Sequence, residues 1–179
     1  VAENFFRQAA DRFSEVVKKS GVIGKIDRIY SYNDHTGYHN TNRWMHFAGC
    51  DPEWVQMITH TMPTVRFAAD PPSRIYNSET FRSRFYGFPN GFAVADNNSN
   101  IKSFLGRQPR PGYTEWQGES GTLLYRGRDR WQPEMRIRRF VDYKTTEDTD
   151  VVFELDRGRF KRLYAALPQG TIEYDNPYK

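Results

Sequence analysis

Three polar side chains in the stretch Gly49–His60 have the spacing of one helix face. Glu53, Gln56 and His60 are separated by three and four residues, and mostly apolar residues lie between them. On a helix, this spacing brings a carboxylate, an amide and an imidazole to the same side. These groups can bind the hydroxyl groups of a ligand, and an imidazole can exchange a proton near neutral pH. The spacing fits equally well a solvent-facing stripe whose histidine lies at the C-terminal end of the helix dipole, so both interpretations stay open.

The residues around this stretch predict a short helix with defined ends. Asp51 can cap the helix, Pro52 can occupy its first turn, and Pro63 lies just beyond its expected end. The preceding segment, residues 34–49, is polar and contains two glycines. We expect this segment to be a loop.

The histidines and the single cysteine are the residues that a metal site would use. All four histidines fall between His35 and His60, and Cys50 is the only cysteine. Catalytic zinc sites usually take a histidine pair from a helix, and the glycine between His35 and His39 argues against a helix there, so we expect no metal. The motifs GxSxG, GxGxxG and GxxxxGK are absent from the sequence. No serine-hydrolase centre and no nucleotide phosphate loop is therefore predicted.

The composition fits one globular domain over residues 1–179. Hydrophobic residues make up 37% of the chain and charged residues 27%, which is typical of a protein with a packed core. No apolar run has the length of a membrane span, and the single cysteine gives no sign of an oxidising compartment, so we expect a cytoplasmic protein. Most of the net charge of +4 comes from Arg126–Phe140. This basic, aromatic segment is compatible with a nucleic-acid surface and with a solvated strand.

The rest of the pattern predicts an α+β domain. Asn4 can cap an amphipathic helix that ends at Gly21, and Gly24–Asn33 is rich in β-branched and aromatic residues, as strands are. From Thr64 onward the chain has strand-like runs and two hairpin patterns, one around FPNGF and one around GESG. We expect an open, mainly antiparallel β-sheet with helices packed on one face.

Several segments, in this order, resemble one enzyme family. The opening VAENFFRQAADRFSEVVKKSGVIGKI is similar to the start of the second domain in the glucose–fructose oxidoreductase and inositol dehydrogenase family. The segment NRWMHFAGCDPEWVQMITHTMP is similar to that family's Arg-Trp segment, its glycine-containing linker and the helix that ends in its catalytic histidine. PNGFAVAD and WQGESGTLLY are similar to its sheet hairpins. The resemblance covers about Val1–Tyr125 and, more loosely, the remaining residues.

The resemblance implies a substrate-binding and oligomerisation domain, the C-terminal half of a two-domain oxidoreductase. The family transfers hydride to or from sugars, polyols and related hydroxy compounds, and NAD or NADP is bound mainly by a preceding Rossmann domain. That domain also carries the family's EKP lysine motif, which does not occur here. The implied partners are a sugar-like substrate, the Rossmann domain of the same parent chain, and further copies of the chain that meet through the sheet. The isolated chain is then expected to be inactive.

The resemblance also implies roles for individual residues. His60 matches the histidine of the family's DxGxH segment, which moves the proton of the substrate hydroxyl. Gln56 stands where the family has its carboxylate, and Ile58 stands where it has glycine. The residues expected to bind substrate, some matched to the family and some chosen for their polarity and position, are Asn4, Arg7, His39, Asn40, Arg43, Trp44, Glu53 and Gln56.

Other function classes remain open from the sequence. A nonenzymatic module that binds carbohydrate or nucleic acid fits the aromatic and basic composition. A catalytically silent member of the family fits the replacement of the expected carboxylate by Gln56.

Overall fold

The computed structural model describes residues 9–32, 37–69, 74–99, 112–126, 134–157 and 159–177. The elements in chain order are α1 (Ala9–Ser20), β1 (Ile26–Tyr32), α2 (Gly37–Ala48), β2 (Trp54–Ala69), β3 (Arg74–Gly87), β4 (Ala93–Ser99), β5 (Tyr113–Gly118), β6 (Gly121–Arg126), β7 (Glu134–Phe140), β8 (Thr146–Asp150), β9 (Val152–Asp156), β10 (Arg159–Leu167) and β11 (Gly170–Asp175).

Most of the described strands belong to one large sheet. Within the described ranges this sheet has eight strands in the order β2-β3-β4-β1-β5-β6-β7-β8, and a smaller sheet has the order β11-β10-β9. β1 pairs parallel with β4 and antiparallel with β5, while the other pairings are antiparallel. The sheet is therefore open and mainly antiparallel, and the only parallel pair in this part of the chain lies at its centre.

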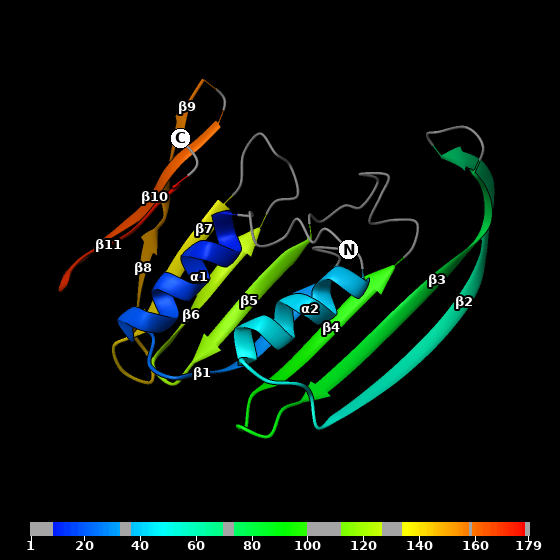
Figure 1. The fold of residues 1–179 in the computed structure, drawn as a ribbon, viewed down its shortest axis with the longest axis horizontal. Coiled ribbons are helices and arrows are strands. Elements are labelled where there is room, and N and C mark those ends of the chain that lie inside the picture. The colour runs from blue at the N-terminus through cyan, green and yellow to red at the C-terminus, as the bar shows by residue number, and fades with distance from the viewer. Residues whose placement is uncertain are drawn as a thin grey trace.

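Both described helices lie on the same face of the large sheet (Figure 1). α1 contacts β6 and also β10 and β11 of the small sheet, whereas α2 contacts β4. The buried core lies between the helices and the sheet and includes Phe13, Ile29, Trp44, Trp116 and Leu123. The opposite face of the large sheet has no described helix over it, and we call it the open face.

The predicted fold class is confirmed. The described part of the first helix and the first strand lie where the sequence placed them, as α1 and β1, while the predicted cap Asn4 lies outside the described residues. Both predicted hairpins form, as β3-β4 and β5-β6. Local alternation and turn residues were sufficient for these elements. No helix among the described residues has the length and apolar character that a membrane span requires.

The predicted loop over residues 34–49 is wrong, because Gly37–Ala48 forms α2. The buried residues of α2 are Asn40, Arg43, Trp44 and Phe47, at helical spacing. The helical pattern was hidden because two of these four residues are polar. Gly49 then ends the helix in a left-handed conformation, with φ of 78° and a hydrogen bond from its N–H to the carbonyl of Met45.

The predicted helix after Asp51 is also wrong, because Trp54–Ala69 forms the edge strand β2. Asp51 and Pro52 resemble a helix start, but Val55, Ile58 and Thr59 favour a strand, and β3 offers a long antiparallel partner. Pro63 is tolerated because β2 lies at the edge, and the register shifts after it.

Two phenylalanines provide a test of this core. Phe13 is completely buried and Phe140 is 46% exposed. We expect Phe13→Ala to lower the free energy of unfolding by about 3–5 kcal/mol because it leaves a cavity, and Phe140→Ala to lower it by less than about 1 kcal/mol. Urea denaturation measures both values. Equal effects of the two substitutions would contradict the described packing.

Candidate functional site

Buried polar residues gather where the three central strands β4, β1 and β5 lie side by side. Ser31 on β1 is in register with Asp96 on β4 and with Thr114 on β5. All three are almost fully buried, as is Asn98 on β4. Buried polar groups need hydrogen-bond partners, so we expect this cluster to form a paired network.

Asp96 is the centre of this cluster. Its side chain has no exposed surface, and it accepts hydrogen bonds from two different elements. Asn40 Nδ2 in the first part of α2 donates to Asp96 Oδ1 at 2.9 Å, and Arg84 Nη1 on β3 donates to Asp96 Oδ2 at 3.2 Å. A buried carboxylate needs such donors, because an unpaired charge in the interior is costly.

Arg43 extends the same network to α1. Its Nη1 donates to Asn40 Oδ1 at 3.1 Å, and its Nε and Nη2 donate to Asp11 Oδ1 at 3.0 and 2.7 Å. The chain of contacts Asp11–Arg43–Asn40–Asp96–Arg84 therefore connects α1, α2, β4 and β3. It contains two cations and two anions in alternation, so the charges compensate each other.

A second contact joins α2 to β3. The hydroxyl groups of Thr41 and Tyr86 are 2.9 Å apart, and Tyr86 also hydrogen-bonds Arg84. The first turns of α2 are thus tied to the sheet through two neighbouring residues, Asn40 and Thr41.

Burial dominates the protonation of this cluster. It raises the pKa of Asp96 above the usual range, and the hydrogen bond from Asn40 and the charges of Arg84 and Arg43 offset part of this increase. Burial likewise raises the pKa of Tyr86, against the hydrogen bond with Thr41.

The structure divides the predicted site residues between two faces. His39, half-buried, lies in the first turn of α2 beside Asn40, on the helix-covered face. Asn40, Arg43 and Trp44 lie on the side of α2 that faces the sheet and are buried. Trp44 packs in the core, while Asn40 and Arg43 belong to the hydrogen-bonded network. Asn4 and Arg7 lie outside the described residues.

Gln56, His60 and Glu53 lie elsewhere. Gln56 and His60 are exposed on β2, opposite Phe85 and Phe81 of β3. Met57 is opposite Arg84, whose side chain points toward α2, so the alternate residues Gln56 and His60 are on the open face. Glu53 precedes the strand and is exposed. The helix face that would have united these three side chains does not exist.

Sequence reasoning missed Asp96, Arg84, Tyr86 and Asp11. One signal for Asp96 was available, because Val94, Asp96 and Asn98 alternate along a strand and occupy the buried positions. A charged residue in phase with buried residues indicates a paired interior group.

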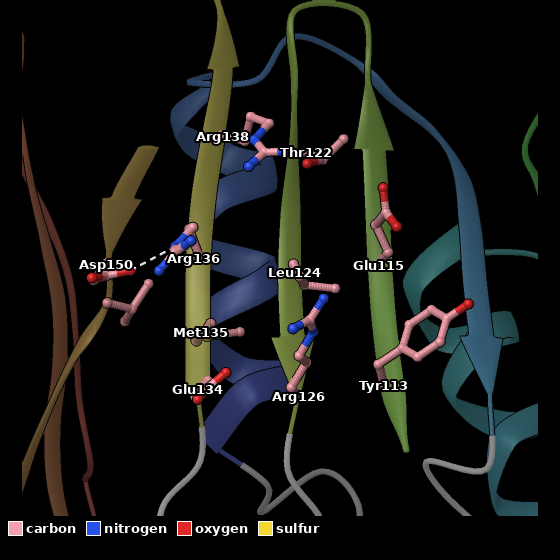
Figure 2. A pocket seen from close by; sticks show the side chains of 11 residues that line it. Tyr113, Glu115, Thr122, Leu124, Arg126, Glu134, Met135, Arg136, Arg138 and Asp150 are labelled. Atoms are coloured by element: carbon pink, nitrogen blue, oxygen red, sulfur yellow. Dashed lines mark hydrogen bonds and ion pairs between the residues drawn. The ribbon is translucent and has the colours of Figure 1, made fainter. Parts of the chain in front are cut away.

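A shallow hollow on the open face is a second candidate. It has a volume of about 790 Å³, and the helices lie behind the strands that form its floor (Figure 2). Its lining residues are Tyr113, Glu115, Thr122, Leu124, Arg126, Glu134, Met135, Arg136, Arg138, Asp150 and Val151.

The arginines of this hollow are largely compensated. Arg136 Nε donates to Asp150 Oδ1 at 2.7 Å, and Arg138 makes two hydrogen bonds to Asp148 at 2.7 and 2.8 Å (Figure 2 shows the first). Arg138 holds the pKa of Asp148 below its usual range. Since carboxylates already bind the guanidinium groups of Arg136 and Arg138, these two arginines do not offer an unpaired charge to a phosphate.

The histidines do not form a metal site in the part of the chain that the structure describes. No three histidine, cysteine, aspartate or glutamate side chains in these ranges are arranged to hold an ion. His35, one member of the histidine set considered from the sequence, lies outside them.

Known structures share this fold. The chain resembles biliverdin reductase from Synechocystis, in a complex with biliverdin and NADP+, with a TM-score of 0.51 and 12% identity over 82% of this chain and 47% of that one. It resembles an NAD-binding oxidoreductase from Klebsiella pneumoniae with a TM-score of 0.53 and 18% identity, over 83% and 45% of the two chains. It resembles levoglucosan dehydrogenase with a TM-score of 0.54 and 13% identity, over 84% and 47%.

The fold is shared with these solved oxidoreductases. The chain spans about half the length of these solved proteins. No family model and no curated protein sequence matches it. The fold expectation from the sequence resemblance is thereby confirmed, and two of these neighbours are named with a nicotinamide cofactor, NADP+ in one case and NAD in the other.

The ionisation of Asp96 makes a testable contribution to stability. Because its pKa is raised in the folded state, its contribution is fully present below its unfolded pKa of about 4 and is lost as the pH rises through the folded value. We expect the free energy of unfolding of the wild type, minus that of Asp96→Asn, to be larger near pH ~4 than near pH ~8. Urea denaturation at both pH values measures this difference. A difference that increases with pH would contradict the buried position of the carboxylate.

Proposed function

We propose that this chain is the substrate-binding half of an NAD- or NADP-dependent oxidoreductase. The substrate is a sugar, a polyol or a related hydroxy compound, and the reaction is hydride transfer. The observation that carries the proposal is the half-buried His39 in the first turn of α2, beside a buried polar network, on a fold shared with half-length segments of known oxidoreductases.

His39 is our candidate for the proton-transfer residue. The family resemblance places glycine two residues before the catalytic histidine, and Gly37 stands two residues before His39. At His60 the corresponding residue is Ile58, and His60 is exposed on an edge strand. His60 remains the alternative that the sequence proposed, and the two histidines lie on opposite faces of the sheet.

The cofactor would be held mainly by another part of the parent protein. The sequence that leads from β1 into α2 holds a single glycine, Gly37, which is the first residue of α2, and it lacks the GxGxxG pattern of a dinucleotide loop. When bound, the cofactor accepts or supplies the hydride. In this chain, oxidation of an alcohol requires a base for the hydroxyl proton, and an imidazole meets this need near neutral pH. Asn4, Arg7 and Glu53 stay proposed as substrate-binding residues.

Matched histidine variants test the assignment. In the full-length protein, with a panel of sugars and polyols and either NAD+ or NADP+, we expect His39→Asn to lower kcat about 100- to 10,000-fold, because a general base is lost. His60→Asn should leave kcat close to the wild-type value. The opposite result would return the catalytic role to His60, and full activity in both variants would remove it from both.

We also propose that the open face joins copies of the chain. Trp54, Ile58 and Phe85 all lie on this face and are 52%, 59% and 40% exposed. Apolar side chains of this size on one exposed face are typical of interaction surfaces. The paired charges across β7 and β8 provide both signs, as a self-complementary interface requires.

Two lysine substitutions on β2 test this interface. Ile58→Lys places a charge on the open face, while Thr59→Lys places the same charge on the adjacent residue, which points to the other face. We expect Ile58→Lys to lower the molar mass from light scattering toward that of one protomer, because an unpaired buried charge is costly. Thr59→Lys should leave the mass unchanged. A protein that is monomeric without either substitution would refute the interface.

A further inference from the structure

We propose that Asn40 and Asp96 are positioning residues for the proton-transfer step. Their hydrogen bond fixes the first turn of α2 and thereby the direction of the His39 imidazole. The inference rests on the proposed function of His39, but it assigns a role to two other residues.

The two halves of α2 are held in different ways. The C-terminal half buries Trp44 and Phe47 in the core, and Phe47 lies 5.7 Å from the ring of Phe92. The N-terminal half buries no apolar side chain among its described positions and is held through Asn40, Thr41 and Arg43. Apolar packing tolerates small shifts, whereas hydrogen bonds require a defined distance and angle. The direction of the N-terminal half therefore depends on its polar contacts.

Asn40 holds the N-terminal half of α2 in its direction through the hydrogen bonds of its side-chain amide. It follows His39 directly, so their side chains are about 100° apart around the helix and move together. Its amide is used at both ends, because Nδ2 donates to Asp96 and Oδ1 accepts from Arg43. Each of these two partners makes a further hydrogen bond to a third residue: Asp96 accepts from Arg84, and Arg43 donates to Asp11.

Replacement of Asp96 by asparagine changes this arrangement without changing its volume. The new amide oxygen can still accept from Asn40, but the new NH₂ group then faces the guanidinium of Arg84, which also only donates. One of these contacts must open. The exchanged pair Asn40→Asp with Asp96→Asn restores one donor and one acceptor between the two positions, and it retains a carboxylate that accepts from Arg43.

The experiment uses the full-length protein with four variants. They are Asp96→Asn, Asn40→Ala, the exchanged pair, and Ser83→Ala as the matched control. Ser83 donates a 2.6 Å hydrogen bond to Asn97 across the same two strands, at the next register position and on the open face. Thermal unfolding identifies the variants that are folded.

We expect Asp96→Asn and Asn40→Ala to lower kcat about 10- to 100-fold with little change in the KM for the cofactor, since small misplacements of a reacting group have effects of this size. The exchanged pair should recover most of kcat, and Ser83→Ala should retain it. In a His39→Asn background, Asp96→Asn should cause no further loss of kcat. An equal further loss in that background, or no recovery by the exchanged pair, would overturn the proposal.

The imidazole proton resonances of His39 provide a readout that does not depend on activity. They should shift in Asp96→Asn and Asn40→Ala and return toward their original positions in the exchanged pair, with no change in Ser83→Ala. Unchanged resonances in the two single variants would refute the positioning role. Shifted resonances together with full activity of His39→Asn would instead refute the proposed function and leave the structural link intact.

Discussion

A carboxylate without any exposed surface determines how the centre of this protein is arranged. The buried carboxylate of Asp96 needs hydrogen-bond donors, and the donors come from more than one element. α2 contributes Asn40, β3 contributes Arg84, and Arg43 connects Asn40 to α1. Each of these elements is thereby fixed relative to β4. The desolvation of the charges makes the network a poor source of stability, but removal of one partner is costly, so the arrangement is specific.

The sequence was informative where structure is local. Strand alternation and turn residues located β3 to β6, and the apolar spacing located α1. It misled where a distant partner decides the outcome. α2 was missed because Asn40 and Arg43 occupy buried positions that only Asp96 and Asp11 make favourable. The first part of β2 was mistaken for a helix because its conformation depends on pairing with residues of β3, such as Phe85 opposite Gln56, and this pairing is not visible in the local sequence pattern. The sequence was enough to propose His39 as a ligand-binding residue. The link from its helix to Asp96 through Asn40 could be recognised only in the folded structure.

The two faces of the sheet have different chemistry. Under the helices, charged groups are few, enclosed and paired with defined partners. On the open face, arginines and carboxylates pair across β7 and β8 in contact with solvent, and Phe85 of β3 is exposed there; the edge strand β2 exposes apolar side chains on both of its faces. Solvent screens the exposed pairs, so each contributes little to stability. The face under the helices therefore suits chemistry that needs fixed groups, and the open face suits contact over a broad area.

The central position of β1 has a consequence for how the protein folds. β1 is the first strand among the described residues, yet its neighbours β4 and β5 come more than sixty residues later (Ile29 pairs with Val94 and Trp116). Closure of these long loops carries an entropic cost before any contact compensates for it, and such topologies fold slowly. On the ribosome, β1 has to wait until β4 and β5 have emerged. During that interval, the apolar residues of β1 lack their strand partners, and partly folded chains with such unpaired strands are prone to aggregate.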